Sequence, residues 1–237
     1  MIPTLLGAIV AADSQQFMAY YVDASAIINI PTWANYVDII SIDGGDAGDT
    51  AHSGSTGGSG GDGGDCRYQA DIPTIGNSQI KCEIALGGSF KDGGNGVGGV
   101  SSVTWGGPGG SSCLSNPVTK IGGRGGLFGT SSPYYGGGGG APGSEKSDGS
   151  DGMAATSHYP GQGASADTSS IIGSFLGSGK VGLTTSQTYI YNGNPWGGGG
   201  GGGCGTTGNG YGTEGGHGGV YLLFKAIATG GLAQPPS

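Results

Sequence analysis

Gly197-Gly-Gly-Gly-Gly-Gly-Gly203 is an unbroken run of glycine, and Gly136–Gly140 and the GGxGG pattern of Gly215–Gly219 have the same character. Glycine loses more conformational freedom on folding than any other residue and has no side chain to bury in return. Such runs fold only if contacts between backbones replace contacts between side chains. Chains without Cβ atoms can form extended threefold helices that lie close enough for backbone hydrogen bonds between neighbours. We therefore expect a packed sandwich of polyglycine II-type helices.

Composition supports an unusual fold. The chain has 60 glycines and 11 prolines among 237 residues, well above the roughly 12% that these residues make up in ordinary proteins. An ordinary enzyme core is therefore not expected, and collagen is excluded because the glycines lack a strict three-residue period. Flexible Gly/Ser linkers are the alternative interpretation. Isolated apolar residues argue against linkers, and they lie between the glycines at Val97, Leu127, Phe128, Ile171 and Leu176.

Segments with little glycine predict β-strands. Ala26–Ile30 runs into Pro31, and Tyr36–Ile42 is rich in β-branched residues and stops at the turn signal Asp43-Gly44-Gly45. Gln79–Leu86 alternates apolar and polar residues, as a strand with one face in water does. Weaker versions of the signal are Val100–Trp105, Thr184–Tyr191 and Val220–Ile227. No segment has convincing helical periodicity, so the predicted fold class is all-β plus irregular extended backbone, with little or no α-helix.

The charge balance limits the partners. With 16 Asp and Glu against 8 Lys and Arg, the chain is a poor partner for a nucleic-acid backbone. No stretch approaches the roughly 20 apolar residues that cross a bilayer, so membrane insertion is not expected. The first positive side chain is Arg67, and a secretory signal peptide is therefore not expected either. These features predict assembly in the cytoplasm of the cell that makes the protein.

The cysteines form no recognisable site. Cys66, Cys82, Cys113 and Cys204 show no CxxC pair and no metal-ligand spacing. Reduced thiols are the first interpretation, and one or two disulfides formed after release from the cell are the alternative.

Motifs for phosphate and calcium are incomplete. Gly173–Val181 approaches a Walker loop, but its spacing is off by one and Val181 replaces the required Ser or Thr. Gly44–Asp49 and Gly61–Asp65 resemble fragments of a calcium-binding repeat that is never sustained. We expect their aspartates, like Asp148 and Asp151, to be solubilising loop tips, with calcium ligation as the alternative.

Catalytic motifs are also missing. His52, His158 and His217 lie in no nucleophile or metal motif. We expect no catalytic residue, no metal and no cofactor, and hence no enzyme. A carboxylate pair for glycoside cleavage depends on the fold rather than on sequence spacing, so a glycan-cleaving enzyme stays open as a minor alternative.

Aromatic residues in loop-like surroundings are the candidate binding site. Tyrosine and tryptophan provide large rigid contact surfaces with a polar group, and adaptable recognition loops favour them beside Ser, Gly and Asn. The alternative is that each ring caps or packs the glycine scaffold. The candidate receptor-binding residues are Tyr134, Tyr135, His158, Tyr159, Tyr189, Tyr191 and Trp196.

Four features in a fixed order resemble the glycine-rich domains at the ends of bacteriophage tail fibres, and more loosely the adhesins that cap T-even-type fibres. They are Ile30-Pro31-Thr-Trp33 with Tyr36–Ile42 and a glycine burst; Ile80–Leu86 with Gly87-Gly88; Gly93–Val103; and Gly215–Phe224. The resemblance implies a glycine-helix sandwich whose variable loops touch an outer-membrane protein or a polysaccharide on a bacterium. It also implies location in a virion, at a tail fibre or tail tip.

The chain departs from these proteins at its start, because a long shaft and a tryptophan-rich attachment domain are both missing. We therefore expect residues 1–25 to attach to another tail or fibre protein or to mediate oligomerisation. Residues 26–229 would form the receptor-binding domain, and residues 230–237 a flexible tail. A homotrimer is favoured over a single copy on a trimeric fibre end. A purely structural glycine-rich protein without receptor binding is the main alternative function.

Overall fold

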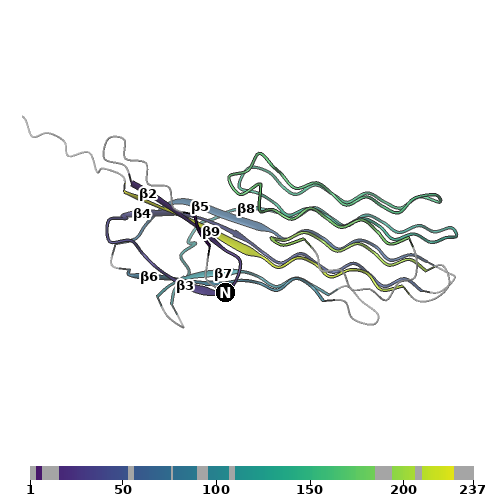
Figure 1. Cartoon of the computed structure of the whole chain (residues 1–237), viewed down its shortest axis with the longest axis horizontal. Helices are drawn as coiled ribbons and strands as arrows, with labels where there is room; N and C mark the ends of the chain where they lie inside the picture. Colours follow the sequence, from purple (N-terminus) through teal and green to yellow (C-terminus); the bar gives the residue numbers. More distant parts are fainter. Residues whose placement is uncertain are drawn as a thin grey trace, which may run out of the picture.

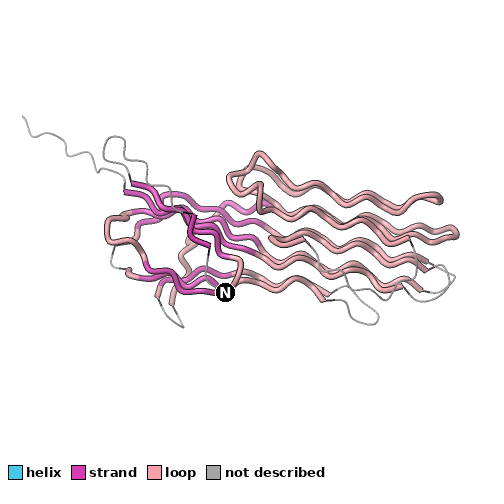
Figure 2. The backbone as a smooth tube through the Cα atoms, viewed as in Figure 1, coloured by secondary structure: helices cyan, strands magenta, loops and turns pink. Residues whose placement is uncertain are grey.

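The computed structural model describes residues 4–6, 16–52, 56–75, 77–89, 96–106, 110–184, 194–205 and 210–226. In these ranges the molecule has two parts along its long axis, with β-sheets at one end and long extended runs of irregular backbone at the other (Figure 1). Figure 2 separates the strands from the runs by colour. The described residues contain no helix, and the prediction of an all-β fold with irregular extended backbone is confirmed.

The described strands form two antiparallel sheets. The larger sheet has six strands in the order β1-β2-β9-β4-β5-β8, and the smaller has three in the order β3-β6-β7. The strand bounds are β1 Thr4–Leu6, β2 Gln16–Val22, β3 Ala26–Asn29, β4 Tyr36–Ile42, β5 Cys66–Pro73, β6 Gln79–Glu83, β7 Ser102–Trp105, β8 Val118–Lys120 and β9 Gly219–Ala226.

Most strand predictions match these elements. The predicted strands over Ala26–Ile30, Tyr36–Ile42 and Val220–Ile227 correspond to β3, β4 and β9, whereas Thr184–Tyr191 lies almost wholly outside the described residues. β1, β2, β5 and β8 carried no strand prediction. β2 belongs to the segment expected to mediate attachment, and it is an interior strand of the larger sheet, paired with β1 and β9.

The alternation in Gln79–Leu86 is correct only over β6. Ile80 and Cys82 are fully buried on the inner face, but Leu86 is 79% exposed. The reason is that the chain leaves the sheet after Glu83 and continues as a glycine-rich run.

Two apolar clusters cover the two faces of the larger sheet. The first lies between the sheets, where Ile39, Leu222 and Phe224 pack with Ile80 and Val103 of the smaller sheet. The second lies on the opposite face and joins Ile40, Ile42 and Tyr221 to residues from outside the sheets, namely Ile172, Leu176 and Trp196. Burial of large apolar side chains is therefore concentrated at the sheet end of the molecule.

The glycine runs are held by hydrogen bonds between backbones, and the run 136–141 is their centre. Its N–H groups donate hydrogen bonds to three neighbouring runs in turn, so each neighbour accepts from every third residue. Gly136 and Gly139 donate to the carbonyl groups of Leu183 and Lys180, and Gly137 and Gly140 donate to those of Gly58 and Gly61. Gly138 and Ala141 donate to those of Met153 and Ser150. The carbonyl groups of this run accept hydrogen bonds from three further runs, again with a period of three residues. The donors are the N–H groups of Gly161 and Ala164, of Gly202 and Gly199, and of Gly126 and Gly123. A period of three residues is that of an extended threefold helix, which supports the helix type expected from the sequence.

Close approach explains why this centre consists of glycine. A Cβ atom on Gly139 would lie 2.2 Å from the carbonyl oxygen of Gly199. No real Cβ contact is so short, so a larger residue would have to push the two runs apart. The runs are thus packed structure, and the linker interpretation is wrong for the described part of the glycine-rich region.

All four cysteines are buried free thiols. Cys82 and Cys113 both neighbour Val103: Cys82 is its partner on β6, and the Cys113 N–H donates to its carbonyl oxygen from the other side. The two thiols therefore stand two strand spacings apart, about 9–10 Å between Cα atoms. This exceeds the roughly 7 Å that a disulfide can span.

Candidate functional site

The site is built where the glycine runs turn at the end away from the sheets, on the right in Figure 1. Two turns there are described throughout, residues 130–135 and 156–159, and we call them the apical turns. They are neighbours, because the backbone of Gly129 approaches both Tyr135 and Thr156. Four predicted site residues therefore lie at one end of the molecule: Tyr134, Tyr135, His158 and Tyr159.

Backbone contacts fix the first apical turn on several sides. The N–H of Tyr134 donates to the Ser131 carbonyl at 2.7 Å, closing the turn, and its own carbonyl accepts from Gly205 at 3.2 Å. The Tyr135 carbonyl accepts from Gly129 at 2.8 Å, and the Cys204 thiol donates to the Pro133 carbonyl at 3.3 Å. The turn is thus presented by a rigid support, with both tyrosine side chains half-buried.

Tyr134 also has a backbone φ of 56°. This left-handed conformation costs a non-glycine residue roughly 1–2 kcal/mol. Residues are held there only where the surroundings determine the conformation, and such positions cluster at functional sites.

The second apical turn exposes its aromatic side chains. The N–H of Thr156 donates to the Tyr159 carbonyl at 2.9 Å, and the Thr156 hydroxyl accepts from the N–H of Tyr159 at 3.0 Å. Ser157 Oγ and His158 Nδ1 are hydrogen-bonded at 2.8 Å. Tyr159 is 71% exposed, and its ring centroid lies 6.5 Å from that of His158.

Trp196 is not at a loop tip, and the expectation of an exposed ring there is wrong. Its side chain is only 3% exposed and packs in the second apolar cluster, with its ring centroid 5.5 Å from Phe175 and 6.4 Å from Tyr21. It fills the space over Gly219, where a Cβ atom would lie 2.3 Å from the indole ring. Trp196 is therefore a packing residue of the sheet end. Tyr189 and Tyr191 lie outside the described residues.

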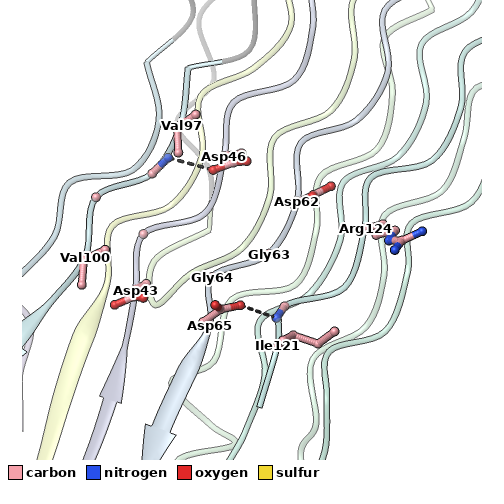
Figure 3. A pocket seen from close by; sticks show the side chains of 14 residues that line it. Asp43, Asp46, Asp62, Gly63, Gly64, Asp65, Val97, Val100, Ile121 and Arg124 are labelled. Atoms are coloured by element: carbon pink, nitrogen blue, oxygen red, sulfur yellow. Dashed lines mark hydrogen bonds between the residues drawn. The ribbon is translucent and has the colours of Figure 1, made fainter. Parts of the chain in front are cut away.

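An acidic groove of about 380 Å³ lies on the side of the molecule, where the runs begin beside the sheet (Figure 3). Asp43, Asp46, Asp62 and Asp65 line it, together with Val97, Val100, Ile121 and Arg124. Burial raises the pKa of both Asp43 and Asp46 above the usual value of 3.8, against opposing hydrogen bonds and, for Asp43, the ion pair with Arg67.

Each groove aspartate is a hydrogen-bond acceptor for a neighbouring run. Oδ1 of Asp46 accepts from the Gly98 N–H at 2.8 Å, and Oδ1 of Asp65 accepts from the Gly122 N–H at 2.9 Å (Figure 3). In the groove, Asp43 pairs likewise with Ser101 and Asp62 with Gly125. Outside the groove lining, Asp148 pairs with Ile121 and Asp151 with Arg124. These carboxylates take the place of carbonyl groups that an adjoining run would supply.

For the groove aspartates, this arrangement corrects the prediction that they are loop tips. The three-residue spacing of Asp43 and Asp46, repeated in Asp62 and Asp65, was the signal in the sequence that could have revealed it, because residues three apart lie on one side of a threefold helix. Within the described ranges, no group of three or more His, Cys, Asp or Glu residues is arranged to hold a metal ion. The groove aspartates accept hydrogen bonds from neighbouring runs, so they contribute to the packing of the bundle.

The sequence patterns did not reveal the polar residues at the apical end, the end of the molecule that carries the apical turns. His52 and Thr56 form an isolated β-bridge beside Gly205, so they lie next to the turn of Tyr134. The threonines and serines at the turns were likewise not singled out, since isolated hydroxyl residues carry no motif.

The described part of the chain contains no helix that could cross a membrane. Comparison with curated proteins finds no match. Residues 22–225 match the family described as "Glycine-rich domain", a range that extends from the end of β2 almost to the end of β9. Because this match covers most of the chain, including the smaller sheet, four of the six strands of the larger sheet and the glycine runs between them, the chain belongs to the glycine-rich domain family.

Proposed function

We propose that the chain is a receptor-binding protein of a bacteriophage tail fibre or tail tip, which contacts a bacterial surface through its apical turns. The observation that carries the proposal is the separation of the two ends. Exposed aromatic and hydroxyl side chains gather at the apical turns, whereas the apolar clusters lie at the sheet end.

The hydrogen-bonded runs give the apical turns a firm base. Binding costs less when the contact surface is ordered before the partner arrives. Tyr134 is held by Ser131 and Gly205, and Tyr159 by Thr156, so neither turn has to fold on contact. Tyr159 and His158 supply exposed rings of the kind that dominate recognition surfaces.

The sheet end is the proposed side of attachment to the virion. β1 and β2, from the segment expected to contact another tail or fibre protein, both belong to the larger sheet. With attachment there, the apical turns point away from the virion, and the chain needs no catalytic residue or cofactor for its role.

The experiment is binding of fluorescently labelled protein to a panel of bacterial strains. We expect strain-selective binding that is weakened by Tyr159→Ala and by the pair Tyr134→Ala and Tyr135→Ala. Ile75→Ala is the matched control, because Ile75 is an equally accessible apolar residue, 83% exposed, in the turn between β5 and β6.

Each variant must first match the wild type in its thermal unfolding. Equal loss of binding in Ile75→Ala and Tyr159→Ala would remove the apical turns from the site. A folded protein that binds no strain would overturn the proposal in favour of a purely structural glycine-rich protein.

A further inference from the structure

Charge is distributed unevenly along the molecule. Among the described residues, the two apical turns contain Thr, Ser, Pro, Tyr and His but no Asp, Glu, Lys or Arg, and the same holds for His52 and Thr56 beside them. At the opposite end of the glycine runs, by contrast, the turn of residues 144–149 includes Glu145, Lys146 and Asp148. The apical end is thus uncharged in a chain whose formal charge is −8.

Charged residues of the adjoining runs lie further inward. Asp49 and Lys180 are each three residues before a residue of the apical end, His52 and Leu183 respectively. Three residues of an extended threefold helix span about 9 Å. This is close to the Debye length of about 8–10 Å in physiological salt, so salt reduces the field of these charges at the apical surface without removing it.

From this surface we infer that the receptor is a neutral polysaccharide. The inference rests on the proposed function and names the class of receptor. A sugar ring has an apolar face of C–H groups, which an exposed Tyr159 or His158 ring can cover, and a rim of hydroxyl groups. Ser and Thr hydroxyls both donate and accept hydrogen bonds and so match that rim without any charge. Tyrosine combines an apolar ring with a hydroxyl group and serves both parts.

A charged receptor fits this end less well. An anionic polysaccharide would meet no Lys or Arg at the described apical residues, although such cations are what recognises acidic groups. A protein receptor would typically require about 800 Å² on each partner with a dry apolar centre. The larger exposed apolar side chains are instead spread along the runs, at Val97, Leu127 and Met153.

The first test uses a strain that the protein binds. Cells are treated with protease or with periodate, and binding is measured as the ionic strength rises from about 0.01 M to about 1 M, a range over which the Debye length falls from about 30 Å to about 3 Å. We expect binding to survive protease, to be lost after periodate, and to change less than about twofold with salt.

The second test identifies the polysaccharide. Capsular and lipopolysaccharide-derived chains from that strain are prepared separately, and each is divided by anion exchange into an unretained neutral fraction and a retained acidic fraction. We expect a neutral fraction to compete with the cells for the protein. Whether that fraction comes from the capsular or the lipopolysaccharide preparation identifies the source of the receptor. Tyr159→Ala should weaken binding of that fraction roughly fivefold to tenfold, while Tyr159→Phe keeps the ring and most of the affinity.

The outcomes separate the two proposals. Protease-sensitive binding, or competition only by the acidic fractions, would overturn the neutral polysaccharide and leave receptor binding in place. A folded protein that binds no strain would overturn both. Loss of affinity in the control variant Ile75→Ala equal to that in Tyr159→Ala would move the sugar site away from the apical turns.

Discussion

Oδ1 of Asp62 accepts a hydrogen bond from the backbone N–H of Gly125 at 2.7 Å. The relationship ties two glycine runs together beside the groove, where none of the described runs lies alongside to supply a carbonyl group. One turn along, Asp65 repeats it with Gly122. A side chain at a position that faces outward thus completes the backbone hydrogen-bonding pattern of its neighbour.

Replacing Asp62 tests this bridge. Asp62→Ala removes the acceptor for the Gly125 N–H, and we expect a loss of about 1 kcal/mol in the free energy of unfolding, because the exposed N–H can turn to water instead. Asp62→Asn keeps an oxygen acceptor and should lose less than half as much. Urea unfolding of the three proteins gives the answer, and equal stability of Asp62→Ala and wild type would show that the bond contributes nothing.

Because burial raises the pKa of Asp46, we predict that removing the charge of this side chain stabilises the folded protein. Burial raises this pKa above 3.8, so between 3.8 and the raised value the folded state holds more protons than the unfolded chain, and stability falls as pH rises through that window. Asp46→Asn keeps the acceptor for Gly98 without the buried charge. We expect a higher melting temperature than wild type at pH 7 and no difference below pH 3.8. A lower melting temperature at pH 7 would contradict the argument.

The pKa of Asp167 is shifted in the opposite direction, so a variant at this residue serves as the comparison. Hydrogen bonds from Ser169 and Ser144 lower its pKa to about 2, so its ionised form stabilises the fold above pH 3.8 and that contribution is lost as pH falls towards 2. Asp167→Asn should therefore lower the melting temperature at pH 7, and its difference from wild type should shrink as the pH falls through about 2. Melting curves for both aspartate variants across this pH range check the two signs together.

The centre of the bundle should not tolerate a methyl group. Gly139→Ala would place its Cβ 2.2 Å from the Gly199 carbonyl oxygen, and we expect a loss above about 4 kcal/mol, seen as a low melting temperature or a low soluble yield. Gly99→Ala is the control, since Gly99 is hydrogen-bonded to neighbouring runs in the same way but its Cβ would have only ordinary contacts at 3.4 Å. Similar behaviour of the two variants would contradict the packing argument.

Trp196 should matter for stability and not for binding. Trp196→Ala removes a buried ring from the second apolar cluster, and we expect a loss of about 3–5 kcal/mol. Cell binding per folded molecule, measured well below the melting temperature, should equal that of wild type. The reverse pattern, unchanged stability with lost binding, would return Trp196 to the recognition site.

The thiols should be unreactive in the folded protein. Burial raises the pKa of Cys66, Cys82 and Cys113 to about 12, and thiolates are the reactive form. Iodoacetamide should modify these three cysteines slowly in native protein and completely in denaturant, as read by mass spectrometry of peptides. Detection of a native Cys82–Cys113 disulfide would contradict the strand register.

Local sequence patterns were enough to predict a strand where one of its faces is buried or where a turn signal marks its end. The β-branched run of β4 and its end at Asp43-Gly44-Gly45 were predictable, as was the alternation of Ile80 and Cys82 in β6. β2 was not, because Tyr20 and Val22 pack on one apolar cluster while Ala19 and Tyr21 pack on the other. A strand buried on both faces shows no alternation.

The sequence by itself determined that glycine runs must pack through their backbones, since residues without side chains have no other means of cohesion, and that tyrosines and a histidine lie in the turns between them. Only the tertiary structure decided which run lies beside which. The backbone hydrogen bonds are alike in every glycine run, and no side chain specifies which two runs pair. The same limit applies to Trp196, whose place over Gly219 depends on a residue more than twenty positions away. It applies also to Asp62, whose partner Gly125 lies on a neighbouring run that only the assembled bundle brings within hydrogen-bond reach.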